Sequence, residues 1–290
     1  MKIVDAHCDT LVKLMESGES LAKNSGPIDL QKLEVYDEAV IFFAIWLSDS
    51  KLDTPFRRTA GAISFFNELC AAMDKKISPI LSLEGGEALE GSIENLYAFH
   101  EMGVKALTLT WNRRNELGDG TSVQNPQGLT DFGRDVVCEM ERLGMLVDVS
   151  HLAQPGFWDV VEITKKPVIA SHSNCFNICP HLRNLTDEQI RAIAQKNGVI
   201  GVNLYPPFLQ KGGYANAETV LAHINHLIKT GGENCVGIGT DFDGIDSTPK
   251  GLEDISRLII LWELIAKHHG QRIADKIFYE NMISVAQKLL

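Results

Sequence analysis

The chain has 290 residues, of which 44% are hydrophobic and 22% are charged, and this balance excludes a disordered protein. Its formal net charge of -11 at pH 7 argues against nucleic-acid binding and against attachment to anionic membranes. The sequence contains neither an apolar run near about eighteen residues nor a basic leader before an apolar stretch, so we expect a cytoplasmic protein.

Eight apolar stretches alternate with helical patterns along the chain. The predicted strands are 2–7, 39–47, 77–84, 104–111, 144–151, 166–172, 198–205 and 235–242. The predicted helices are 56–75, 92–102, 131–143, 155–164, 186–196, 216–230, 252–269 and 272–289. Strands this apolar are typical of a parallel sheet that helices cover on its outer face. The pattern therefore predicts a (β/α)8 TIM-type barrel that forms one domain over residues 1–290.

An open doubly wound sheet is the alternative to a closed barrel. Such sheets often carry a GxGxxG loop after the first strand. The glycine-rich stretches "EGGE" (84–87) and "GIGTDFDG" (237–244) lack that spacing, which favours the barrel. The loops after "IWL" (45–47) and "TLTW" (108–111) are long and polar, and we expect them to cover a substrate.

Ionisable side chains stand at the C-terminal ends of five predicted strands. They are His7, Asp9, Glu84, His151, His172 and Asp241. His7 and Asp9 are two residues apart, so a strand would project both from one face. A (β/α)8 barrel builds its active site at this end of the sheet, so we expect all six groups at one mouth. Three histidines and three carboxylates suit zinc, with enough ligands for two ions if one carboxylate bridges them.

Other polar residues near these strand ends are open to two interpretations. Arg183 in "CPHLRNLT" is either a solvated arginine or a clamp for a substrate carboxylate, which its planar guanidinium suits. Asp148 and Ser150 in "DVSH" should face away from His151, so we expect them to support ligands or to pack. Asp243 shares a face with Asp241 and suits a turn.

These motifs, taken in chain order, resemble the membrane (renal-type) dipeptidases of peptidase family M19. The matching stretches are "DAHCDT" (5–10), "LSLEGGEAL" (81–89), "LTLTWN" (107–112), "GLTDFGRDVVCEMERLGMLVDVSH" (128–151), "PVIASHS" (167–173), "RNLTDEQI" (183–190), "GVIGVNLY" (198–205) and "GIGTDFDGI" (237–245). The resemblance implies an amidohydrolase-type barrel with two zinc ions, although other divalent metals would suit the same ligands. It also implies dipeptide substrates, which in some members carry a D-residue at the second position.

The resemblance also assigns roles residue by residue. It implies that His7 and Asp9 bind one zinc ion, that Glu84 bridges the two ions, and that His151 and His172 bind the second. It further implies that Asp241 is the general acid and base, that Arg183 binds the substrate's C-terminal carboxylate, and that Tyr205 lines the pocket.

One position departs from the family pattern. Mammalian members have a histidine after "LTLT" that helps to hold the substrate carbonyl, whereas this chain has Trp111. The tryptophan either donates its N–H or packs, in which case Asn112 takes a polar role. Substrate orientation is the property that this exchange affects.

The expected function is a zinc-dependent dipeptidase in which a hydroxide bridging the metals attacks the peptide bond. One alternative is another binuclear amidohydrolase acting on a lactone, cyclic amide or phosphoester. Those enzymes more often begin with HxH and bridge their metals with a modified lysine at the fourth strand, where this chain has HxD and Trp111. A silent barrel kept as a binding module is a second alternative, which the complete ligand set disfavours. A homo-oligomer stays open.

Overall fold

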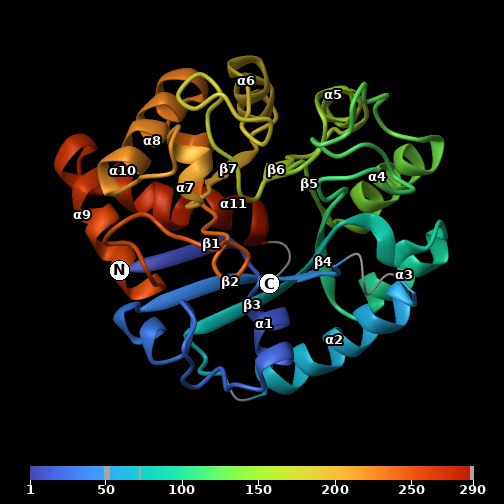
Figure 1. Cartoon of the computed structure of the whole chain (residues 1–290), viewed down its shortest axis with the longest axis horizontal. Coiled ribbons are helices and arrows are strands. Elements are labelled where there is room, and N and C mark those ends of the chain that lie inside the picture. Colours follow the sequence, from blue (N-terminus) through green and yellow to red (C-terminus); the bar gives the residue numbers. More distant parts are fainter. Residues whose placement is uncertain (49–52, 72, 288–290) are drawn as a thin grey trace.

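The computed structural model describes residues 1–48, 53–71 and 73–287, and it contains a closed barrel of eight parallel strands (Figure 1). The strands are β1 (Lys2–Cys8), β2 (Glu38–Trp46), β3 (Ile77–Glu84), β4 (Val104–Thr108), β5 (Leu146–Asp148), β6 (Ile169–Ala170), β7 (Val199–Val202) and β8 (Val236–Ile238). β1 pairs with β8 through Asp5 and Ile238, which closes the sheet without a free edge. The predicted (β/α)8 fold is confirmed.

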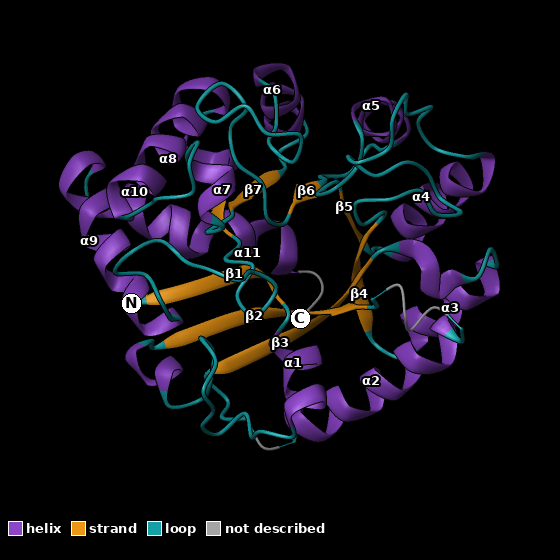
Figure 2. Ribbon diagram, in the orientation of Figure 1, coloured by secondary structure: helices purple, strands orange, loops and turns teal. Residues whose placement is uncertain are grey.

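Helices surround the sheet on its outer side (Figure 2). They are α1 (Thr10–Ser17), α2 (Pro55–Cys70), α3 (Ile93–Glu101), α4 (Asp131–Leu143), α5 (Gln154–Ile163), α6 (Asp187–Gln195), α7 (Pro206–Leu209), α8 (Ala217–Gly231), α9 (Leu258–His269), α10 (Gln271–Asp275) and α11 (Asn281–Ala286). α6 begins with a capping box: the Thr186 hydroxyl accepts from the Gln189 backbone amide, and the Gln189 side-chain oxygen accepts from the Thr186 backbone amide. The short helices α1 and α7 were not predicted, and both lie directly beside the strand ends that carry the site.

Several strands are shorter than their apolar patterns. β5 covers 146–148 where 144–151 was predicted, and β6 covers 169–170 where 166–172 was predicted. His151, three residues beyond β5, adopts a left-handed backbone with φ 64°, so the strand cannot extend to residue 151 as predicted. β4 likewise ends at Thr108, so Trp111 lies in the following loop and not on the strand.

The barrel interior is filled by apolar side chains from the strands β1 to β7 and from the last helix. These residues are Val4, Ala6, Val40, Phe42, Ile80, Ala106, Leu146, Ile169, Val199, Met282 and Ala286. The predicted helix 272–289 is divided into α10, a π-helical turn (Lys276–Glu280) and α11, and residues 288–290 lie outside the described residues. α11 thereby covers the N-terminal end of the barrel, and the opposite end carries the polar residues.

Among the described residues, no helix combines the length and the apolar character that crossing a bilayer requires.

Candidate metal centre and substrate cavity

A bulge in β1 aims His7 into the barrel mouth. Val4 and Ala6 face the interior, so strict alternation would turn His7 outward. The register with β2 shifts between Asp5 and Cys8, where three steps along β1 oppose two along β2. Such a bulge turns the following side chains to the other face. The Nε2 atom of His7 consequently lies 3.4 Å from an oxygen of Asp9, which directly precedes α1.

Glu84, the last residue of β3, presents one carboxylate oxygen to each of two histidine groups. Its Oε2 atom lies 3.6 Å from His7 Nε2. Its Oε1 atom lies 3.0 Å from His151 Nε2 and 3.5 Å from His172 Nε2. The potential ligand atoms form three groups, two of which share Glu84, one with His7 and Asp9 and the other with His151 and His172. The third group joins His7, His172 and Asp241. Although burial favours the neutral acid, the His7 and His151 imidazoles hold the pKa of Glu84 well below its usual range.

The donor atoms of this site fit divalent cations. His7 Nε2 is buried and has no hydrogen-bond partner. His151 Nε2 and His172 Nε2 lie 2.8 Å apart. The Nδ1 atoms of these two rings lie 2.9 Å from Asn112 Oδ1 and 2.7 Å from Ser171 Oγ. With a hydrogen on each Nδ1, each Nε2 would offer its lone pair to a cation. Inward lone pairs beside carboxylates match the nitrogen and oxygen ligands that zinc prefers.

Asp148 supports the metal centre from behind His172. Its carboxylate accepts from the Ser171 amide at 2.9 Å, from the Ser171 hydroxyl at 2.6 Å and from the Thr108 hydroxyl at 2.5 Å. Because Ser171 also contacts His172 Nδ1, this network fixes the orientation of the ring. The network holds the strand ends of β4, β5 and β6 together.

Asp5 has a comparable place on the other side of the site and was missed from the sequence. Its carboxylate accepts from the Thr240 amide at 2.8 Å and from the Thr240 hydroxyl at 2.6 Å, which ties β1 to the segment after β8. Burial raises the pKa of Asp5 to about 6. The signal available in the sequence was its position two residues before His7 inside an apolar strand.

Asp241 stands opposite the histidines at the mouth of the barrel. Its Oδ1 atom lies 3.9 Å from His7 Nε2, and its Oδ2 atom accepts from Asn203 Nδ2 at 2.8 Å. Burial raises the pKa of Asp241 to about 7. Its backbone is left-handed, with φ 63°, a strained state for a non-glycine residue that tends to occur at functional sites. A Cβ at Gly244 would lie 2.2 Å from Asp9 Oδ2, so the close approach of this loop requires glycine.

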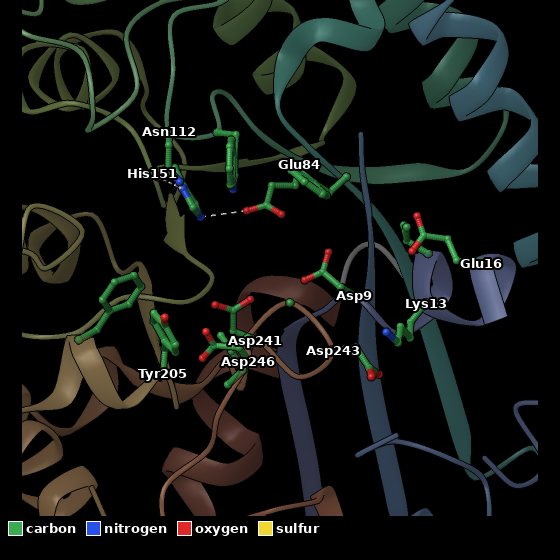
Figure 3. A pocket seen from close by; sticks show the side chains of 16 residues that line it. Asp9, Lys13, Glu16, Glu84, Asn112, His151, Tyr205, Asp241, Asp243 and Asp246 are labelled. Atoms are coloured by element: carbon green, nitrogen blue, oxygen red, sulfur yellow. Dashed lines mark hydrogen bonds and ion pairs between the residues drawn. The ribbon is translucent and has the colours of Figure 1, made fainter. Parts of the chain in front are cut away.

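A cavity of about 380 Å³ opens onto these residues (Figure 3). Asn112, His151 and Glu84 lie on one side of it, and Tyr205, Asp241 and Asp246 lie on the other. Trp111 also lines it, with its ring centroid 5.0 Å from that of Trp46 at the end of β2. Trp46 was not predicted as a site residue, although it ends a strand as Glu84 does.

Arg183 lies at a different place from the other predicted substrate-binding residues. It lines a second cavity of about 510 Å³ and does not line the first. Its Nη2 atom donates to the His172 carbonyl at 3.2 Å, and its guanidinium lies 5.6 Å from the centroid of the Phe208 ring. Burial lowers the pKa of Arg183 to about 10, at which it stays charged at neutral pH.

Asp243 and the loop after β4 also line the cavities. Asp243 accepts from the Thr10 hydroxyl at 2.6 Å and sits in a turn with φ 68°. The loop after β4 contributes to both cavities, through Trp111 and Asn112 in the first and 121–124 in the second. Of the loop after β2, which we expected to cover a substrate, residues 49–52 lie outside the described residues.

A closed (β/α)8 barrel whose strand ends gather three imidazoles and three carboxylates defines a metal-dependent hydrolase. A sequence model of the membrane dipeptidase family, peptidase family M19, matches residues 1–289, and the chain belongs to this family. The predicted family is confirmed, and the protein is a metallodipeptidase.

Two known proteins of similar sequence match large parts of the chain, and one of them is named as a dipeptidase. Dipeptidase aclJ of Aspergillus oryzae is 37% identical over 186 residues, which are 63% of this chain and 44% of that protein. An uncharacterized protein in the pqqA 5' region of Klebsiella pneumoniae is 35% identical over 227 residues, 74% of this chain and 83% of that protein.

Two crystal structures share the whole fold. The M19 metallopeptidase dipeptidase AC has a TM-score of 0.91 at 27% identity, covering 99% of this chain and 98% of that one. A metallopeptidase from Rhodobacter sphaeroides has a TM-score of 0.89 at 27% identity, covering 100% of this chain and 99% of that one. The latter is bound to a phosphinate mimic of the dipeptide L-Ala-D-Ala.

Proposed function

We propose that this dipeptidase is a binuclear zinc enzyme. His7 and Asp9 hold one ion, His151 and His172 hold the other, and Glu84 bridges the two. The observation that carries the proposal is the division of the Glu84 carboxylate, whose two oxygens face separate histidine groups. Three imidazole nitrogens favour zinc over magnesium or calcium, which prefer oxygen ligands.

When bound, the two ions lower the pKa of a water toward neutrality, so that it serves as the nucleophile, and they polarise the scissile carbonyl. The chain's own part in the reaction is the movement of protons. Asn203 occupies one oxygen of Asp241 and leaves the other facing His7 and the cavity. Asp241 accepts the proton from the attacking water and passes it to the leaving amine.

The substrate is a zwitterionic dipeptide. Arg183 binds its C-terminal carboxylate, because the guanidinium is buried close to the site and carries no carboxylate partner among the described residues. Tyr205, Trp111 and Asn112 line the cavity that receives the amine end of the molecule. Because the Rhodobacter enzyme binds an L,D-dipeptide mimic, substrates with a D-residue at the second position belong in the first assays.

Asn112 has a second role in this proposal. Its side-chain oxygen holds the Nδ1–H of His151 and so sets the tautomer that a metal ligand needs. Trp111 instead packs against Trp46, so we propose that it shapes the apolar wall of the cavity. Asn112 therefore does not replace the histidine that mammalian members have at this place, because its side-chain oxygen already contacts His151.

A cytoplasmic location is also part of the proposal. All six cysteines are unpaired and four of them are buried, as is usual for proteins of a reducing compartment.

Hydrolysis of a peptide panel tests the function. Metal-stripped protein is assayed before and after addition of zinc with L,L-dipeptides, L,D-dipeptides and matching tripeptides. We expect cleavage of dipeptides alone, and only after zinc is added. If protein shown to hold two metals cleaves no peptide, a lactone, cyclic amide or phosphoester becomes the better substrate class.

A further inference from the structure

A second cavity adjoins the metal centre on the far side of His151. It has a volume of about 510 Å³ and lies between the loop after β4 and the loop after β6, beside the start of α5. His151 lines both cavities, so the two meet at a candidate metal ligand. Each cavity therefore has a wall at this candidate ligand.

The two cavities differ in charge. Beyond the candidate ligands and Asp241, the first is lined by Glu16, Asp243 and Asp246 and by one lysine, Lys13. Among the described residues that line the second, His151 and Arg183 are the ionisable ones, and no carboxylate is present. A dipeptide carries an amine at one end and a carboxylate at the other. The charges therefore favour its amine in the first cavity and its carboxylate toward the second.

Arg183 carries an independent sign of a ligand at the second cavity. The side chain is 5% exposed, and its Nε atom is buried without a hydrogen-bond partner. Buried guanidinium N–H groups are almost always paired, so this one is arranged for a group that is bound in the working enzyme. An anionic oxygen is the partner that such a donor prefers.

We propose that the second cavity holds the side chain of the substrate's C-terminal residue and that it selects bulky, uncharged side chains. This inference rests on the proposed dipeptidase function and adds the substrate class. Val149, Leu152 and Phe176 supply apolar surface, and Gln124 and Gln154 supply neutral polar groups. A basic side chain would meet the charge of Arg183 and find no carboxylate, so C-terminal lysine and arginine are disfavoured.

Two substitutions reduce this cavity from different sides. Ser122 lies on the loop after β4 and Gln154 at the start of α5, and both are exposed at its rim. In Ser122→Trp and Gln154→Trp, we expect the ratio of kcat/KM for Ala-Phe to that for Ala-Ala to fall about tenfold or more. The ratio for Phe-Ala to Ala-Ala should not fall. The unmodified holoenzyme should also cleave Ala-Leu about tenfold faster than Ala-Lys.

Matched variants complete the design. Val12 lines the first cavity and not the second, so Val12→Trp should lower the Phe-Ala ratio and spare the Ala-Phe ratio. Gln195, exposed near the end of α6, lines neither cavity, and Gln195→Trp should leave both ratios unchanged.

The outcomes separate this inference from the proposed function. If the unmodified holoenzyme cleaves no dipeptide, the proposed function fails. If it cleaves Ala-Ala and Ala-Phe but neither tryptophan at the second cavity changes their ratio, the assignment of the cavity is overturned. An equal loss for all substrates, or a preference for Ala-Lys over Ala-Leu, overturns it as well.

Discussion

Replacing Asp241 with asparagine removes the proposed proton carrier while preserving the shape of the side chain. The amide oxygen can still accept from Asn203, which now contacts Asp241 Oδ2 at 2.8 Å. The distance of 3.9 Å from Asp241 Oδ1 to His7 Nε2 exceeds the 3.4 Å and 3.6 Å distances that the oxygens of Asp9 and Glu84 make to the same atom. Because Asp241 also forms a group of potential ligand atoms with His7 and His172, metal content has to be measured together with turnover. General acid–base catalysis contributes about 10²–10⁴-fold, or about 2.7–5.4 kcal/mol, so we expect kcat to fall by this factor.

The assay for Asp241→Asn measures kcat on one dipeptide together with metal content by mass spectrometry. Asp243→Asn is the matched comparison, because Asp243 lies two residues away in the same turn but bonds to Thr10. We expect the Asp243 variant to lose much less turnover than the Asp241 variant. Full turnover of Asp241→Asn with both metals bound would refute the proton-transfer role.

Three further substitutions test other contacts of the structure. Asn112→Ala removes the acceptor for His151 Nδ1–H and should weaken metal binding about 10–100-fold, measured by competition with a chelator. The hydrogen bond from Arg114 lowers the pKa of Asp119 below its unfolded value of about 3.9. The stability that this pair contributes is fully present above about pH 4 and is lost as the pH falls through the folded pKa. Asp119→Asn should therefore destabilise the protein at pH 7 but much less at acid pH. Urea titrations at both pH values measure the difference. Met282→Ala opens the packed end of the barrel and should cost about 2–5 kcal/mol of unfolding free energy by urea titration, whereas no measurable loss would contradict the packing described for α11.

The barrel and most polar residues at its strand ends could be predicted from the sequence, because these features depend on local patterns. An apolar strand that ends in a polar residue can be recognised in the sequence, and parallel strands in a barrel bring their ends together. Glu84, at the end of β3, is an example that the structure places beside three histidines. Asn203, one residue beyond β7, was missed because the predicted strand ran to residue 205 and so placed Asn203 inside it.

The parts that the sequence did not predict depend on contacts between distant segments. The bulge in β1 is visible only against the register of β2, so the inward direction of His7 could not follow from alternation. The contact between Asn112 and His151 joins residues 39 positions apart. The second cavity arises where the loops after β4 and β6 pack beside the start of α5, and Arg183 lines it from the loop after β6.

A zinc titration of metal-free protein tests directly whether two ions share Glu84. Bound zinc per chain and dipeptidase activity are measured on the same samples as zinc is added. We expect activity to reach its maximum at two equivalents of zinc per chain, and we expect Glu84→Gln to bind both ions more weakly. Full activity at one equivalent, or in protein without metal, would contradict it.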